Sequence, residues 1–257
     1  MAVFSSPETW LAANFGEALD NISFGDAINL TDGTWSLYDP DGLLNSISYD
    51  PVTEYHTVVW NALAVGSADY NWGSGANHRS PRWYKLAKIN GVQLTTDDIV
   101  QAIFYAQVDN INRGDFDCQM VHGISVDPTS TTANTILGCG LIAQAWLSSA
   151  NTHMGIWTVN SPNALAVVSP ASDRCITTCQ YGGLHVGGGS WTIVDSSGNR
   201  TNSGARSGNG VLPSATNLNW IVGVGPRINT TTIGAGNESQ KFRIFRTAVK
   251  TDLGSVL

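Results

Sequence analysis

Closely spaced carboxylates are the first residues to examine, because a pair of them cleaves glycosidic bonds in many β-sandwich enzymes. The 257-residue chain has only four glutamates, and no two of them lie within eight residues of each other: Glu8, Glu17, Glu54 and Glu238. The nearest substitute is the aspartate pair Asp115 and Asp117. We therefore expect a protein that is not an enzyme and has no catalytic residues, since glycan cleavage would depend on this unusual aspartate pair.

The histidines and cysteines form no catalytic or metal-binding pattern. Nucleophilic catalysis pairs a serine or cysteine with a histidine base, but the histidines are scattered singly and no Gly-x-Ser-x-Gly turn is present. His122 follows Cys118 by four residues, which predicts one shared strand face and a buried histidine with satisfied hydrogen bonds. The oxygen-rich stretch 109–117 lacks the EF-hand spacing and is more typical of a hairpin turn. We expect no metal, no cofactor and four reduced cysteines.

Two aromatic residues lie in a polar turn, within Asp69, Tyr70, Asn71 and Trp72. Aromatic rings can stack on a sugar while the neighbouring Asp and Asn bind its hydroxyl groups. Tryptophan is also enriched at subunit interfaces. We rank a subunit interface first, a lid over the core second and a glycan-binding site third for these four residues.

The charge balance argues against a nucleic-acid partner, and the hydropathy pattern argues against membrane insertion. The chain has 13 Lys and Arg against 20 Asp and Glu, a net charge of −7, without the basic patch of a nucleic-acid-binding protein. No apolar run approaches the roughly 20 residues of a membrane span, and no secretory signal is visible. We expect no nucleic acid, no membrane insertion and assembly in a cytosol. A local exception is Lys241, Arg243 and Arg246, which predict a cationic outer face on the C-terminal strand.

The N-terminal segment predicts a short amphipathic helix over residues 7–19. Ser6 is a suitable N-cap and Pro7 suits the first helical position, and apolar residues recur along one face. This helix either packs on its own domain or belongs to an arm that docks on another subunit. We assign residues 1–33 to an attachment arm, whose contact residues would be Phe4, Trp10, Leu11 and Phe15.

The rest of the chain, residues 34–257, predicts a single β-sandwich domain. Turn signals such as those at 39–42 and 90–91 separate runs rich in Val, Ile, Thr and aromatic residues. Alternation is clearest over 100–108, which predicts a half-buried strand. About a dozen such runs indicate an all-β, antiparallel two-sheet sandwich. Residues 195–217 are rich in Gly, Ser and Asn, which favours a long loop.

Several motifs together resemble virion structural proteins of tailed bacteriophages: TWSL at 34–37, DPDG at 39–42, TVVWNAL at 57–63, ADYNW at 68–72 and PRWYK at 81–85. The resemblance covers roughly residues 1–108. It implies a lectin-like jelly-roll sandwich of the concanavalin A type, displayed on a capsid or tail and assembled in the host cytoplasm. It also implies virion proteins as partners and self-association into a homo-oligomer, which in such proteins is commonly a trimer.

Two functions follow from these observations. The first is a non-enzymatic virion structural protein, such as a decoration, head-fibre or tail-knob subunit, that docks through its N-terminal arm. The alternative is a lectin-like module that recognises glycans on the host surface. The two are compatible, because a decoration protein can also bind host sugars.

Overall fold

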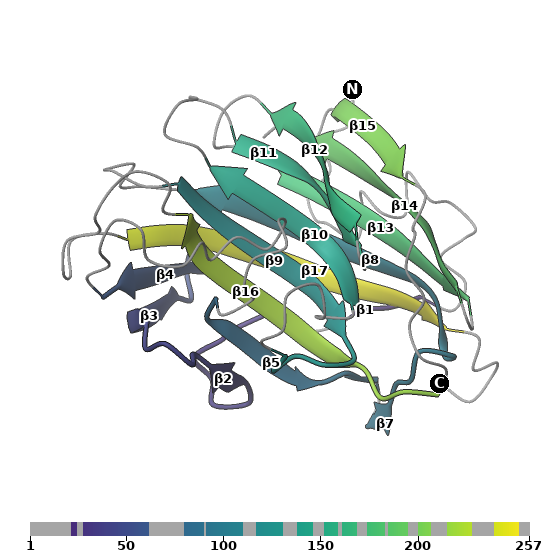
Figure 1. The fold of residues 1–257 in the computed structure, drawn as a ribbon, viewed down its shortest axis with the longest axis horizontal. Helices are drawn as coiled ribbons and strands as arrows, with labels where there is room; N and C mark the ends of the chain where they lie inside the picture. The colour runs from purple at the N-terminus through teal and green to yellow at the C-terminus, as the bar shows by residue number, and fades with distance from the viewer. Residues whose placement is uncertain are drawn as a thin grey trace.

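The computed structural model describes thirteen segments of the chain: 22–24, 28–61, 80–89, 91–109, 117–130, 138–145, 152–158, 161–168, 174–182, 185–194, 200–206, 215–227 and 239–251. These segments contain seventeen strands and no helix (Figure 1). The predicted helix over 7–19 lies outside the described residues. Within them, there is also no helix long and apolar enough to cross a membrane.

Eight strands form one sheet, here called the back sheet. In spatial order it contains β15 (Arg200–Arg206), β14 (His185–Val194), β13 (Arg174–Gly182), β8 (Ile99–Asp109), β17 (Ser239–Thr251), β4 (Tyr55–Trp60) and β3 (Leu44–Asp50), and β1 (Ile22–Phe24) pairs with β17. All of these pairings are antiparallel. The long central strands β8 and β17 carry the alternating patterns that the sequence predicts.

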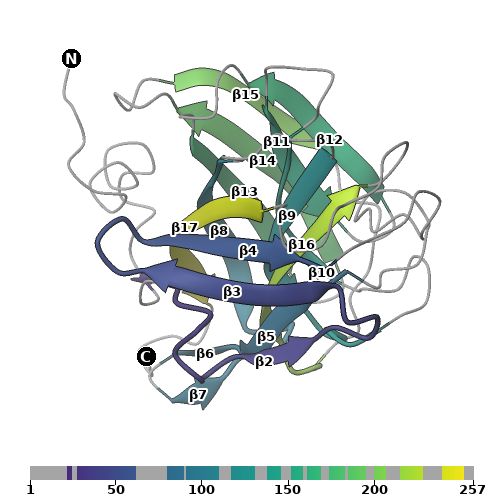
Figure 2. The same cartoon turned by 90° about the vertical axis from the view of Figure 1, so that its left-hand side faces the viewer.

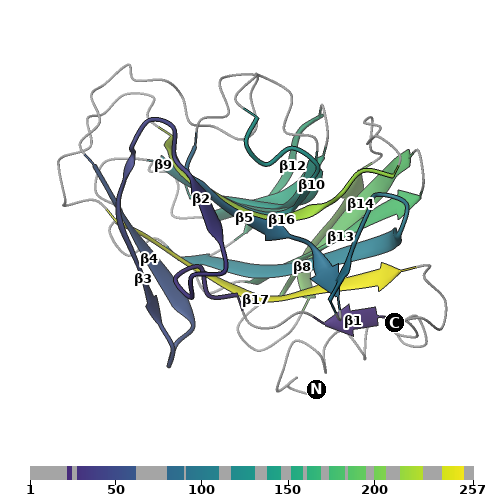
Figure 3. The same ribbon diagram turned by 90° about the horizontal axis from the view of Figure 1, so that it is seen from below.

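Seven strands form the second sheet, here called the front sheet. In spatial order it contains β12 (Ser161–Val168), β11 (Thr152–Thr158), β10 (Gly138–Ala145), β9 (Asp117–Ser125), β16 (Asn219–Arg227), β5 (Arg82–Leu86) and β2 (Ser36–Tyr38). A small hairpin of β6 (Lys88–Ile89) and β7 (Val92–Gln93) follows β5. Figure 3 shows the two sheets as layers, with β16 and β5 in one and β17 and β8 in the other. The predicted all-β, antiparallel two-sheet sandwich is confirmed.

The core lies between the sheets, where alternate residues of each central strand face the opposite layer. Met120, Val222 and Val224 come from the front sheet, and Phe104 and Phe242 come from the back sheet; all five side chains are fully buried. Burying a side chain of this size contributes about 1.5–3 kcal/mol. The apolar positions of the alternating runs therefore supply the stabilisation that holds the layers together.

One segment differs from the sequence prediction. Residues 195–217 were expected to form a loop because they are rich in Gly, Ser and Asn, yet residues 200–206 form β15 at the edge of the back sheet. An edge strand is held by its backbone hydrogen bonds to a single neighbour, so it needs few of the bulky side chains that mark a central strand. The composition of this segment therefore does not indicate a strand.

Part of the predicted N-terminal arm, residues 1–33, contacts the sandwich. Ile22–Phe24 pair with Ala248–Lys250 of β17, and the buried Leu30 donates its backbone N–H to Nε2 of His56 in β4 at 3.0 Å. Residues 1–21, which include Phe4, Trp10, Leu11 and Phe15, lie outside the described residues. Their role as an attachment arm stays a prediction.

Candidate functional site

The buried histidines have structural roles. The ring of His122 in β9 donates from Nδ1 to the carbonyl of Ile221 at 3.3 Å and accepts at Nε2 from Thr247 of β17 at 2.5 Å. This bond crosses from the front sheet to the back sheet. Burial lowers the pKa of His122 to about 4, so the ring is neutral at pH 7. The prediction of a buried, hydrogen-bonded sheet histidine is confirmed.

The direction of His122 fixes which residues of the front sheet face outward. Its ladder partner Val222 is paired in turn with Trp83 of β5, so Trp83 faces the interior and is nearly fully buried. Side chains alternate along a strand. Arg82 and Tyr84, on either side of Trp83, therefore belong to the outer face of the front sheet, together with their β2 partners Tyr38 and Ser36.

Arg82 organises this outer face. Its guanidinium group donates to the carbonyls of Pro128 and Ser130 and lies over the Tyr38 ring, 4.7 Å from the centroid. The side chain is fully buried although it projects from the outer face, because the segment that follows β9 covers it. Burial lowers the pKa of Arg82 to about 10, which still leaves it charged at pH 7. The buried cation thus fixes residues 128–130 against the sheet.

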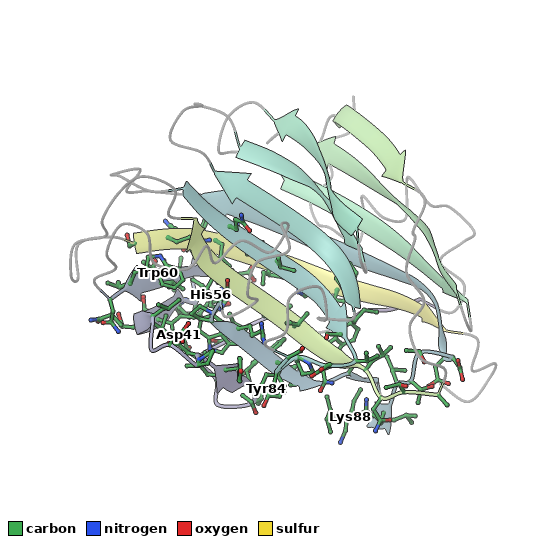
Figure 4. The ribbon with its side chains drawn as sticks, in the orientation of Figure 1. Asp41, His56, Trp60, Tyr84 and Lys88 are labelled. Atoms are coloured by element: carbon green, nitrogen blue, oxygen red, sulfur yellow. The ribbon has the colours of Figure 1, made fainter. Side chains whose placement is uncertain are left out.

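A polar aromatic surface surrounds this anchor, and we call it the tyrosine surface: Tyr38, Tyr84, Ser36 and Asp127. Both tyrosines are partly exposed, and Ser36 and Asp127 are exposed. Figure 4 labels Tyr84 beside β2 and β5, at the lower margin of the front sheet. Two partly exposed rings supply apolar faces, while a hydroxyl group and a carboxylate supply hydrogen-bonding atoms. This combination suits a ligand that has both C–H faces and hydroxyl groups.

Replacing the anchor tests its structural part. Arg82→Met should lower the free energy of unfolding by about 3 kcal/mol, because the buried carbonyl of Pro128 and the partly buried carbonyl of Ser130 would lose the bonds that Arg82 donates. Urea denaturation followed by tryptophan fluorescence measures this loss. The control is Lys85→Met in the same strand. The Lys85 ammonium lies 4.6 Å from the Trp35 ring centroid, a cation–π contact worth about 1 kcal/mol or less at a partly exposed site. Equal losses for the two variants would show that Arg82 is no anchor.

The predicted site residues and the observed surface differ. Asp69, Tyr70, Asn71 and Trp72 lie outside the described residues, so their role stays a prediction. The tyrosine surface was missed by the sequence analysis, although alternation within the motif PRWYK places Arg82 and Tyr84 on one face. Within the described segments, no three His, Cys, Asp or Glu side chains are arranged to hold a metal ion.

Comparisons with solved structures place the fold among known β-sandwiches. The CBM2 module of Lactobacillus casei BL23 phage J-1 evolved Dit is similar, with 8% sequence identity and a TM-score of 0.50 over 90% of this chain and 98% of that one. Peanut lectin matches with 10% identity, a TM-score of 0.46, and coverage of 90% and 96%. A Bacillus licheniformis β-glucanase matches with 8% identity, a TM-score of 0.44, and coverage of 90% and 98%.

No protein-family model and no curated protein matches the sequence. The likeness to the solved structures is therefore one of fold. The chain is a lectin-like jelly-roll sandwich, as the resemblance in its sequence implies.

Proposed function

We propose that this chain is a non-enzymatic carbohydrate-recognition module of lectin type. The tyrosine surface is the observation that carries the proposal. Tyr38 and Tyr84 occupy diagonal positions on neighbouring strands of one outer face, where their rings can stack on the C–H faces of a pyranose. Ser36 is the β2 partner of Tyr84, and Asp127 lies near enough to interact electrostatically with Arg82, so both can bind hydroxyl groups of a ligand stacked on the tyrosines.

The Arg82 anchor orders the binding surface before any ligand binds. Residues 125–130 are held by Arg82, by the bond from Asp127 N to Ser125 Oγ at 3.1 Å, and by a turn from Ser130 N to Asp127 O at 3.4 Å. A loop that is already ordered loses little conformational entropy when a ligand binds. This supports binding through Asp127 and the two tyrosines without a large rearrangement.

The non-enzymatic part of the proposal rests on where the carboxylates lie. Of the four glutamates only Glu54 falls in the described segments, in the turn between β3 and β4 of the back sheet. Among the four described residues that define the tyrosine surface, Asp127 alone carries a carboxylate, and hydrolysis of a glycosidic bond generally uses two carboxyl groups that flank the bond. A single carboxylate suits hydrogen bonding to hydroxyl groups.

We further propose that the module is displayed on a bacteriophage virion and works in host attachment. The sequence resemblance to virion structural proteins supports this setting. The fold shared with a CBM2 module of a phage Dit protein agrees with it. In this setting the N-terminal arm, residues 1–33, would attach the module to other virion proteins through Phe4, Trp10, Leu11 and Phe15, and the subunits would self-associate.

Calorimetric titration with a panel of neutral oligosaccharides tests the carbohydrate-binding function. We expect binding of at least one glucose-, galactose-, mannose- or N-acetylglucosamine-containing ligand. Tyr84→Ala should weaken that binding at least about tenfold, because one stacking partner is worth on the order of 1–3 kcal/mol. Val52→Ala is the control, since Val52 is 88% exposed in the β3–β4 turn, on the other sheet. Absence of binding by the unmodified protein, or unchanged binding by Tyr84→Ala, would refute the proposal.

A further inference from the structure

The cationic residues are distributed unevenly along this acidic chain. Residues 1–78 contain ten acidic residues and no Lys or Arg, whereas residues 241–250 contain four Lys and Arg and no acidic residue. The basic segment lies within β17, next to β4 of the N-terminal third (Figure 2). The predicted cationic outer face is confirmed for Lys241 and Arg243, since the alternate residues Phe242 and Ile244 are buried. The side chain of Arg246, the third predicted cation, lies outside the described part of the structure.

Lys241 and Arg243 are held on one aromatic ring. The Lys241 ammonium lies 4.2 Å from the centroid of the Tyr55 ring, and the Arg243 guanidinium lies 4.7 Å from the same centroid. Arg243 also donates from Nη1 to the carbonyl of Thr53 at 3.0 Å. All three side chains of this cluster are partly exposed on the outer face of the back sheet. The ring and the turn therefore hold both cations beside Tyr55 on one face of the sheet.

Lys241 and Arg243 are like charges beside the same ring, so both make the electrostatic potential at this surface more favourable for an anion. Asp50 lies near enough for Lys241 to help lower its pKa, so it offsets part of this charge, while its oxygens accept from Thr53 Oγ1 at 2.6 Å and from Val52 N at 2.9 Å. An anion bound by both cations would gain charge-assisted hydrogen bonds.

We infer that Lys241, Arg243 and Tyr55 form a second binding site, which takes an anionic group carried by a polysaccharide. The anionic group is a carboxylate or a phosphate, since both match the donors of arginine and lysine. The neighbouring ladder positions Thr57 and Ser48 carry hydroxyl groups beside Lys241, which extends the surface with groups that can bind a sugar. This site lies on the sheet opposite the tyrosine surface, so it is independent of the carbohydrate-binding function proposed above.

Binding of soluble polymers tests this site. The probes are polygalacturonate for carboxylates, a glycerol-phosphate polymer for phosphates and dextran as the neutral polymer, each at low and at high salt. We expect one or both polyanions to bind at low salt, to weaken as salt rises, and dextran to bind much less at this site. Lys241→Gln with Arg243→Gln should reduce polyanion binding at least about tenfold.

Three further variants test whether polyanion binding depends on the site formed by Lys241 and Arg243. Lys85→Gln removes a single cation that lies over an aromatic ring on the front sheet, and it should leave polyanion binding unchanged. Asp50→Asn should strengthen binding, because the Asp50 carboxylate lies near enough to Lys241 for the two charges to interact. Tyr84→Ala should retain polyanion binding, so that failure of one site does not imply failure of the other. Equal loss in Lys85→Gln and the double variant, or equal binding of a short DNA duplex, would overturn the inference.

Discussion

Acidification from pH 7 to about pH 4 is expected to destabilise the folded protein by about 3 kcal/mol for each of two buried histidines. Burial lowers the pKa of both His56 and His122 from 6.5 to about 4. The unfolded chain therefore binds two protons between pH 6.5 and pH 4 that the folded chain does not. Stability contributed by the neutral rings is complete above pH 6.5 and is lost as the pH falls toward 4.

The structure gives the physical reason for this resistance to protonation. His56 accepts at Nε2 from Leu30 N, and its ring is stacked on Phe242 with the centroids 5.2 Å apart. His122 accepts at Nε2 from Thr247, and its ring packs against the Phe104 ring in a T-shaped arrangement with the centroids 5.2 Å apart. A proton at either Nε2 atom would remove the acceptor and place a charge in an apolar layer.

Urea denaturation at several pH values measures the effect. Between pH 6 and pH 4.5 the free energy of unfolding should fall by up to about 2.7 kcal/mol per pH unit, which corresponds to two protons. His122→Gln removes one titrating group, so its slope should be about half as steep, even though the variant is less stable at pH 7. A slope that stays the same in both single variants, His56→Gln and His122→Gln, would show that other groups titrate. Asp50 is no such group, because hydrogen bonds from Thr53 and Val52 lower its pKa below 3.8.

Much of the fold could be predicted from the sequence because it depends on local patterns. Alternation over 100–108 predicted β8, and turn signals separated most of the other strands. β15 was missed, since the backbone pairing of an edge strand leaves little trace in a Gly/Ser/Asn-rich composition. Its partner β14 ends at Val194, close to β15 in the chain, but residues 200–206 contain none of the β-branched aliphatic or aromatic side chains that mark a strand in a sequence.

The tyrosine surface shows the same limit at the level of single residues. The alternation that places Arg82 and Tyr84 on one face is local, and it could have been used. Tyr38 joins them only through the register of β2 against β5. Burial of Arg82 depends on residues 128–130, which come from the connection after β9. Contacts between segments so far apart follow from the sheet order, which one sequence alone does not fix.

Gly140→Ala is expected to lower the free energy of unfolding by about 4 kcal/mol or more, an exceptional loss for a single methyl group. Gly140 of β10 is the ladder partner of Gly123 in β9. A Cβ atom at position 140 would lie closer than 3.0 Å to backbone atoms of His122 and Gly123. Because backbone atoms cannot rotate away as a side chain does, the two strands would have to separate. That separation would also move His122 and weaken its bond to Thr247 across the sandwich.

Gly42→Ala is the matched control, because Gly42 has a φ of +62° and no atom within 4 Å of the added Cβ. Strain in the left-handed region should cost it only about 1 kcal/mol. Thermal and urea unfolding of both variants would be compared with the unmodified protein. If the close approach of β9 and β10 leaves no room for a Cβ atom at position 140, Gly140→Ala must lose several times more stability than Gly42→Ala. Equal losses would mean that the front sheet yields at this point, and that the His122–Thr247 bond does not depend on the spacing of these strands.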